Sequence, residues 1–155
     1  MDEYLVVKWL HIVSSTILFG TGIGTAFYLF VASRSRDARI AHFVARKVVA
    51  ADWVFTGTSA IVQPLTGLYL VHLAGYAILS PWIVWSIALF LVAGACWLPV
   101  VWLQKQMRDM AAAAVAAGTE LPERYWRFHR IWVALGVPAF ASLLVVFYLM
   151  VAKPT

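Results

Sequence analysis

Four long apolar stretches dominate this chain of 155 residues and limit the folds that it can adopt. They cover residues 4–31, 53–75, 81–103 and 131–151, and Lys8 is the one formally charged side chain within them. The apolar core of a bilayer is about 30 Å thick and requires roughly 20 such residues in a helix. The sequence therefore predicts an all-α protein, an integral membrane four-helix bundle that forms a single transmembrane domain over residues 1–155.

The composition also indicates lipid as the solvent and excludes several classes of function. Hydrophobic residues make up 63% of the chain and charged residues 12%, whereas a soluble globular chain is about one quarter charged. Cys96 is the single cysteine, so an intrachain disulfide is not expected. The sequence lacks a Walker loop, a dinucleotide-binding fingerprint, HExxH and CxxC. Hydrolytic and nucleotide chemistry are therefore not expected.

The basic residues indicate the orientation in the membrane. Ten of the 12 lysines and arginines lie in the two longer connections, whereas Lys8 and Lys153 lie on the opposite side. The ten are Arg34, Arg36, Arg39, Arg46, Lys47, Lys105, Arg108, Arg124, Arg127 and Arg130. Cytoplasmic loops carry an excess of basic residues, which predicts an N-out/C-out, multi-pass protein of the cell inner (cytoplasmic) membrane. Basic residues confined to short loops favour membrane lipid, and not nucleic acid, as the partner.

Local signals predict that both basic connections are helical. Asp37 suits the opening turn of a helix that runs into the second stretch. Residues 111–117 favour helix, Gly118 suits a C-terminal cap, and Pro122 with Glu123 suits the start of the next helix. The first stretch is expected to be a retained helix and not a signal peptide, because acidic residues replace a basic leader region.

The histidines are the residues most able to carry chemistry at membrane depth. His11 lies about seven residues into the first stretch, roughly 10 Å below its outer end, and His72 lies near the outer end of the second. Imidazoles are axial ligands of haem iron, and two at similar depth would form a six-coordinate site. The alternative for His72 is an interfacial residue bonded to water or a headgroup. His129 is expected at the inner interface and His42 in a solvated loop.

Other polar residues allow structural and functional interpretations. His11 shares a helix face with small and hydroxylated residues that could accept either a flat macrocycle or another helix, namely Ser14, Ser15, Leu18, Gly22 and Thr25. Gln63 could bond the backbone carbonyl that Pro64 frees. Asp52 could pair with Arg46 or Lys47, or pass protons. Arg124, Arg127 and Arg130 alternate with aromatic residues, which is typical of an interfacial anchor; the alternative is a clamp for cofactor carboxylates.

Several short motifs resemble a known family. Residues 8–11 (KWLH) resemble the Lys-x-Leu-His motif in the first helix of HemJ-type protoporphyrinogen oxidases, where the histidine is associated with haem. Residues 67–70 (GLYL) and 151–154 (VAKP) resemble later motifs of that family, although the third stretch lacks the family's lysine and histidine. Residues 51–53, 63–67 and 135–140 resemble a predicted integral membrane protein family of unknown function in the same CopD-like, HemJ-like superfamily.

Together, the resemblance and the histidines suggest a membrane protein that binds haem b. His11 and His72 are the expected axial ligands, His129 is the choice if the macrocycle lies in the inner half, and Lys153 is an expected contact for a haem carboxylate. The expected activity is electron transfer or oxidation of a hydrophobic or porphyrin-like substrate by a haem-dependent membrane oxidoreductase. The alternatives are a copper or small-solute permease, or a non-catalytic subunit within a homo-oligomer or beside a partner membrane subunit.

Overall fold

The computed structural model describes residues 2–154, and this part of the chain is helical and contains no strand. The helices are α1 (Glu3–Arg34), α2 (Ala38–Ala51), the π-helical segment η1 (Asp52–Gly57), α3 (Thr58–Leu73), α4 (Pro81–Ala117) and α5 (Glu123–Ala152). α2, η1 and α3 follow one another without a break, so residues 2–154 form four continuous rods that are long and apolar enough to cross a membrane. This confirms the predicted all-α, four-helix architecture.

The helix boundaries follow the local signals in the sequence. The Asp37 carboxylate caps α2 by accepting hydrogen bonds from the backbone N–H groups of Arg39 and Ile40, at 2.7 and 3.3 Å. α4 ends at Gly118, whose φ of 65° lies in the left-handed region that glycine adopts at no steric cost. Both predicted helical connections are therefore confirmed. α4 contains 37 residues, about 55 Å at 1.5 Å per residue, so it extends well beyond the apolar layer.

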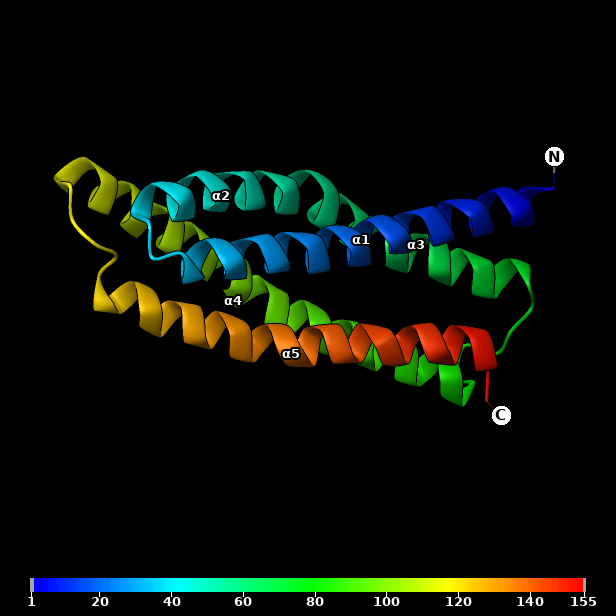
Figure 1. Ribbon diagram of the computed structural model, residues 1–155. Coiled ribbons are helices and arrows are strands. Elements are labelled where there is room, and N and C mark those ends of the chain that lie inside the picture. The colour runs from blue at the N-terminus through cyan, green and yellow to red at the C-terminus, as the bar shows by residue number, and fades with distance from the viewer. Residues whose placement is uncertain (1, 155) are drawn as a thin grey trace.

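The four rods form two pairs (Figure 1). α1 packs along α3, and α4 packs along α5, while α2 joins the pairs by packing against both α1 and α4. The two termini lie at the same end of the bundle, as four spans require (Figure 1). We call the opposite end, where the ten loop lysines and arginines lie, the basic end. Direct packing between α1 and α5 is sparse, so the two pairs diverge away from the basic end.

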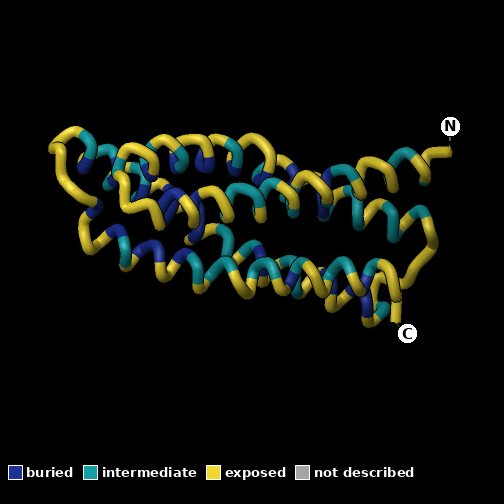
Figure 2. The backbone as a smooth tube through the Cα atoms, viewed as in Figure 1, coloured by how far each residue is buried: buried dark blue, intermediate teal, exposed yellow. Residues whose placement is uncertain are grey.

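The best-packed core lies at the basic end, where dark blue segments gather in Figure 2. Leu29, Met107 and Tyr125 are fully buried there, although they come from three different helices. The Tyr125 hydroxyl lies 2.7 Å from the Ser33 hydroxyl, which donates its own hydrogen bond to the Leu29 carbonyl. Tyr125 therefore donates to Ser33 and joins α5 to α1. Most remaining apolar side chains are exposed, as helices that face lipid require.

This buried contact predicts the effect of removing one hydroxyl. Tyr125→Phe should lower the free energy of unfolding by about 1 kcal/mol, because it leaves the Ser33 oxygen without its donor. Unfolding in mixed micelles with increasing dodecyl sulfate measures the change. Tyr148→Phe is the matched control, since Tyr148 is exposed on the same helix. Equal stability of the two variants would contradict a structural role for this hydrogen bond.

Candidate functional site

His11 belongs to a polar cluster that joins α1 to α3. Gln63 donates from Nε2 to the His11 carbonyl at 2.6 Å and to the Ser14 hydroxyl at 2.5 Å. Thr66 lies one turn further along α3, with its hydroxyl 2.8 Å from Nδ1 of His11. Gln63 thus crosses to the neighbouring helix, which differs from the expectation that it bonds the carbonyl freed by Pro64. We call His11, Ser14, Gln63 and Thr66 the α1–α3 polar cluster.

The hydrogen bonds of Thr66 define the tautomer of His11. The Thr66 hydroxyl donates its single proton to the Val62 carbonyl at 2.7 Å, so it can only accept from His11. His11 therefore carries its proton on Nδ1 and leaves a lone pair on Nε2. Gly67 allows this close approach, because a Cβ atom there would lie 3.1 Å from Cε1 of His11. The imidazole is held by α3 with one nitrogen free of hydrogen bonds among the described residues.

The other outer-side candidates lie apart from His11. His72 is exposed and stacks on the Tyr69 ring, with the ring centroids 6.4 Å apart. It follows Gly67 by five residues, which is about 8 Å along the helix axis. Lys153 donates from Nζ to the Tyr76 hydroxyl at 2.9 Å and lies over the Trp82 ring. The assignment of His72 as second haem ligand, and of Lys153 as a carboxylate contact, stays a prediction.

His129 has the most unusual surroundings of the histidines. It is buried near the start of α5, and its Nε2 has no hydrogen-bond partner among the described residues. The Phe30 ring stacks on it with centroids 5.6 Å apart, and the rings of Trp126 and Trp132 lie at 6.0 and 5.6 Å. His129 is thus enclosed by aromatic rings and buried within the helix bundle.

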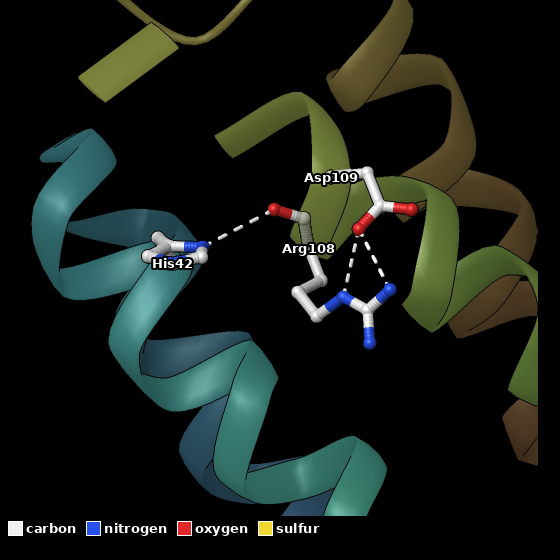
Figure 3. Close-up of polar contacts among 3 residues, drawn as sticks. All are labelled: His42, Arg108 and Asp109. Atoms are coloured by element: carbon white, nitrogen blue, oxygen red, sulfur yellow. Dashed lines mark hydrogen bonds and ion pairs between the residues drawn. The ribbon is translucent and has the colours of Figure 1, made fainter. Parts of the chain in front are cut away.

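His42 is not in a solvated loop. It lies on α2, and its Nδ1 donates to the Arg108 carbonyl of α4 at 3.3 Å (Figure 3). The Arg108 side chain turns away from this contact and forms an ion pair of 2.7 Å with Asp109 (Figure 3). His42 therefore has a structural role at the basic end, joining α2 to α4. In residues 2–154 no three His, Cys, Asp or Glu side chains gather as a metal site.

A cavity of about 620 Å³ lies between the two helix pairs. Its walls come from the inner half of α1, from η1 and the start of α3, and from the middle of α4 and α5. Six aromatic side chains line it: Phe27, Phe30, Phe90, Trp97, Trp132 and Phe140. The cavity is also lined by three residues from the His11 face of α1, namely Leu18, Gly22 and Thr25. On the same face, His11 and Ser14 contact α3 instead. One face of α1 thus accepts a helix at one level and borders a cavity at the next.

Several lining side chains of α1 and α5 are exposed, and these two helices pack sparsely against each other. The exposed side chains are Ile23 and Phe27 on α1 and Val137 and Leu144 on α5. The cavity is therefore open between these helices. Phe19 closes one end of the gap by meeting Phe140 edge-on, with the ring centroids 5.7 Å apart. In a bilayer this opening faces lipid, so a molecule dissolved in the membrane can enter without crossing water.

The polar part of the cavity is centred on Asp52 in η1. Asp52 is 3% exposed, and its carboxyl group accepts a hydrogen bond from the Thr56 hydroxyl at 3.1 Å. Gln104 of α4 and Thr25 of α1 lie beside the same carboxyl group. Within residues 2–154 no basic side chain forms an ion pair with it, so the expected pairing with Arg46 or Lys47 is absent. π-Helical segments occur frequently at functional sites.

Two further polar atoms in the cavity wall are buried without a partner among the described residues. They are Oε1 of Gln104 and Nε1 of Trp97. The Trp97 ring lies against η1, where a Cβ atom on Gly57 would be 3.8 Å from it. Buried polar atoms are nearly always hydrogen-bonded, and exceptions require an explanation. We call Asp52, Thr56, Thr25 and Gln104 the Asp52 cluster.

The arginines at the start of α5 form a separate, shallow surface feature. Arg124, Arg127 and Arg130 line a hollow of about 230 Å³ together with Glu123. Arg130 lies 3.8 Å from Glu123, and Arg124 lies over the Phe128 ring. Arginines beside aromatic rings at this level are typical of an anchor at the headgroup layer. The residues are far along the chain from the Asp52 cluster and do not line its cavity.

Sequence reasoning did not find the site around Asp52. Gln104 lies one residue beyond the third predicted stretch, and Thr25 and Thr56 read as ordinary small residues of membrane helices. The one sequence feature that could have indicated this site was Asp52 itself, because an acidic residue next to an apolar stretch requires a partner. Its true partners come from α1 and α4, and only the fold brings them together.

The fold and the cavity define a four-helix membrane protein with a polar cluster buried in its interior. A family model described as "Predicted integral membrane protein (DUF2269)" matches residues 5–154. The chain therefore belongs to the DUF2269 family. No curated protein and no solved structure matches the chain.

The α1–α3 polar cluster predicts a spectroscopic result. Nitrogen NMR of histidine-labelled protein should detect His11 as the Nδ1–H tautomer, because Thr66 can only accept. Thr66→Val keeps the side-chain shape but removes the acceptor, so the protonated nitrogen should lose its hydrogen-bonded shift. Thr16→Val is the control, since Thr16 bonds only to the Ile12 carbonyl of its own helix. An unchanged His11 signal in Thr66→Val would contradict the assignment.

Proposed function

We propose that the protein binds a membrane-soluble organic molecule in the cavity between its two helix pairs. The observation that carries this proposal is the combination of about 620 Å³ of apolar space with a few converging polar groups. Ligand sites typically have volumes of roughly 300–1,000 Å³ and this mixture of lining groups. The positive-inside rule would place the basic end in the cytoplasm, so the ligand would lie in the inner half of the membrane.

The glycines of the cavity wall make a direct test feasible. Gly94 and Gly136 line the cavity, and a Cβ atom on either would meet nothing within 4 Å. Leucine at both positions should fill the cavity without straining the helices, since leucine favours helix more than glycine does. We expect native mass spectrometry to detect one small molecule that co-purifies with the wild type and is lost in Gly94→Leu/Gly136→Leu.

Gly20→Leu is the matched control for this experiment. Gly20 is also helical with open space around its Cβ position, but it is exposed and does not line the cavity. The control should retain the bound molecule. The proposal fails if wild type and double variant carry the same mixture of bulk lipids in the same proportions.

A second proposal, haem b binding through His11, is supported by the tautomer of that histidine. An axial histidine usually donates its other ring N–H to a fixed acceptor, and Thr66 accepts from Nδ1 while Nε2 keeps its lone pair. His129 is the alternative ligand, because its buried Nε2 is unpartnered and its neighbours Phe30 and Trp132 line the cavity. Bound haem would supply one-electron chemistry, as the resemblance to HemJ-type oxidases implies.

Absorption spectra decide this second proposal. The purified protein, air-oxidised and then reduced with dithionite, should give a Soret band and sharp reduced α and β bands. The variants His11→Ala, His72→Ala and His129→Ala are compared, and the bands should be lost where the replaced histidine is an axial ligand. His42→Ala is the control, because His42 is bonded to the α4 backbone. A colourless protein expressed with sufficient haem would exclude the proposal.

A further inference from the structure

We infer that the Asp52 cluster binds the protonated amine of a lipophilic amine whose apolar part fills the cavity. This inference rests on the proposed ligand-binding function and adds the chemical class of the ligand. It joins three observations on residues 2–154: a buried carboxyl group without a basic partner, the amide oxygen of Gln104 buried beside it without a donor, and a wall of aromatic rings.

Within the described part of the chain, the hydrogen bonds of the cluster leave the amide oxygen of Gln104 without a donor. The Thr56 hydroxyl already donates to Asp52, and the Thr25 hydroxyl donates to the Thr21 carbonyl of its own helix at 2.8 Å. Oε1 of Gln104 is buried without a donor among the described residues, and Gln104 is 3% exposed. Asp52 and Oε1 of Gln104 therefore offer acceptors, while Nε1–H of Trp97 is a buried donor of the same wall without a partner among the described residues. An ammonium group has several N–H donors and can bond to both acceptors at once, whereas an alcohol can donate to only one.

Charge gives the same assignment. A carboxylate buried without a cation is costly by several kcal/mol and otherwise takes up a proton, and within residues 2–154 the protein forms no ion pair with Asp52. A bound ammonium group would supply the missing charge. The aromatic walls add to this, because the faces of Trp, Tyr and Phe rings attract organic cations. The apolar part of the same molecule would enter through the opening between α1 and α5 and remain against Phe90 and Phe140.

Three probes that share the phenylbutyl group separate the contributions of charge and hydrogen bonding. They are phenylbutylamine, the neutral alcohol phenylbutanol, and phenylbutyl trimethylammonium, which has the charge but no N–H. Each probe is tested for its ability to displace the apolar photolabel adamantyl diazirine from the cavity of the full-length protein in lipid nanodiscs. Labelling near Trp97 is quantified by mass spectrometry, and each probe concentration is corrected for partition into protein-free nanodiscs.

We expect the wild type to bind the amine roughly 10- to 100-fold more tightly than the alcohol, in the range of buried charge pairs. Asp52→Asn should remove this difference by weakening binding of the amine far more than binding of the alcohol. Gln104→Met should weaken binding of the amine to the level of the trimethylammonium probe and leave that probe unaffected. Asp109→Asn is the matched control, because it is the same substitution at a residue outside the cavity. Asp109 forms a surface ion pair with Arg108.

The outcomes distinguish the two levels of the proposal. If alcohol and amine displace the label equally in the wild type, the amine assignment is wrong while binding in the cavity stands. If the label never enters the cavity, or labels Gly94→Leu/Gly136→Leu as strongly as wild type, the ligand-binding function itself is wrong. If Asp52→Asn does not fold, Gln104→Met and the three probes on wild type still decide the amine assignment.

Discussion

The absence of a hydrophobic driving force between helices in lipid is the constraint on which this structure depends. Lipid tails are as apolar as leucine, so helices must associate through close packing and hydrogen bonds. The protein meets this requirement at two levels. Tyr125 and Ser33 join α5 to α1 within the tightly packed basic end, and the α1–α3 polar cluster joins α1 to α3 further out. Between these levels α1 and α5 make little contact, and the cavity is the result.

The cavity wall combines groups with different roles. The aromatic rings and exposed rim residues suit an apolar molecule from the bilayer, and the Asp52 cluster is the polar point at which such a molecule can be oriented. His11 is held by Thr66 outside this cavity, so the two candidate sites are separate in space. A ligand in the cavity and a group bound at His11 would therefore contact different residues.

The sequence predicted the fold well because its signals were local. Apolar stretches of membrane-spanning length, the Asp37 cap and the Gly118 terminus each act within a few residues, and all were confirmed. The candidate sites were less accessible, because they depend on which helix faces which. The side chain of Gln63 could have served its own helix or a neighbour, and only packing decides for α1. The partners of Asp52 come from residues far away in the chain, and no local pattern connects them.

The π-helical segment η1 has a consequence for comparing this chain with its relatives. A π-helical turn is equivalent to one extra residue in an α-helix, and one residue corresponds to a rotation of about 100°. Within the rod Ala38–Leu73, η1 thus sets the phase of α3 relative to α2. A homologue that lacks one residue between Asp52 and Gly57 would keep an unbroken helix, but its counterparts of Gln63 and Thr66 would turn away from α1. A one-residue gap at this point of an alignment would therefore identify homologues in which α3 packs against α1 through other residues.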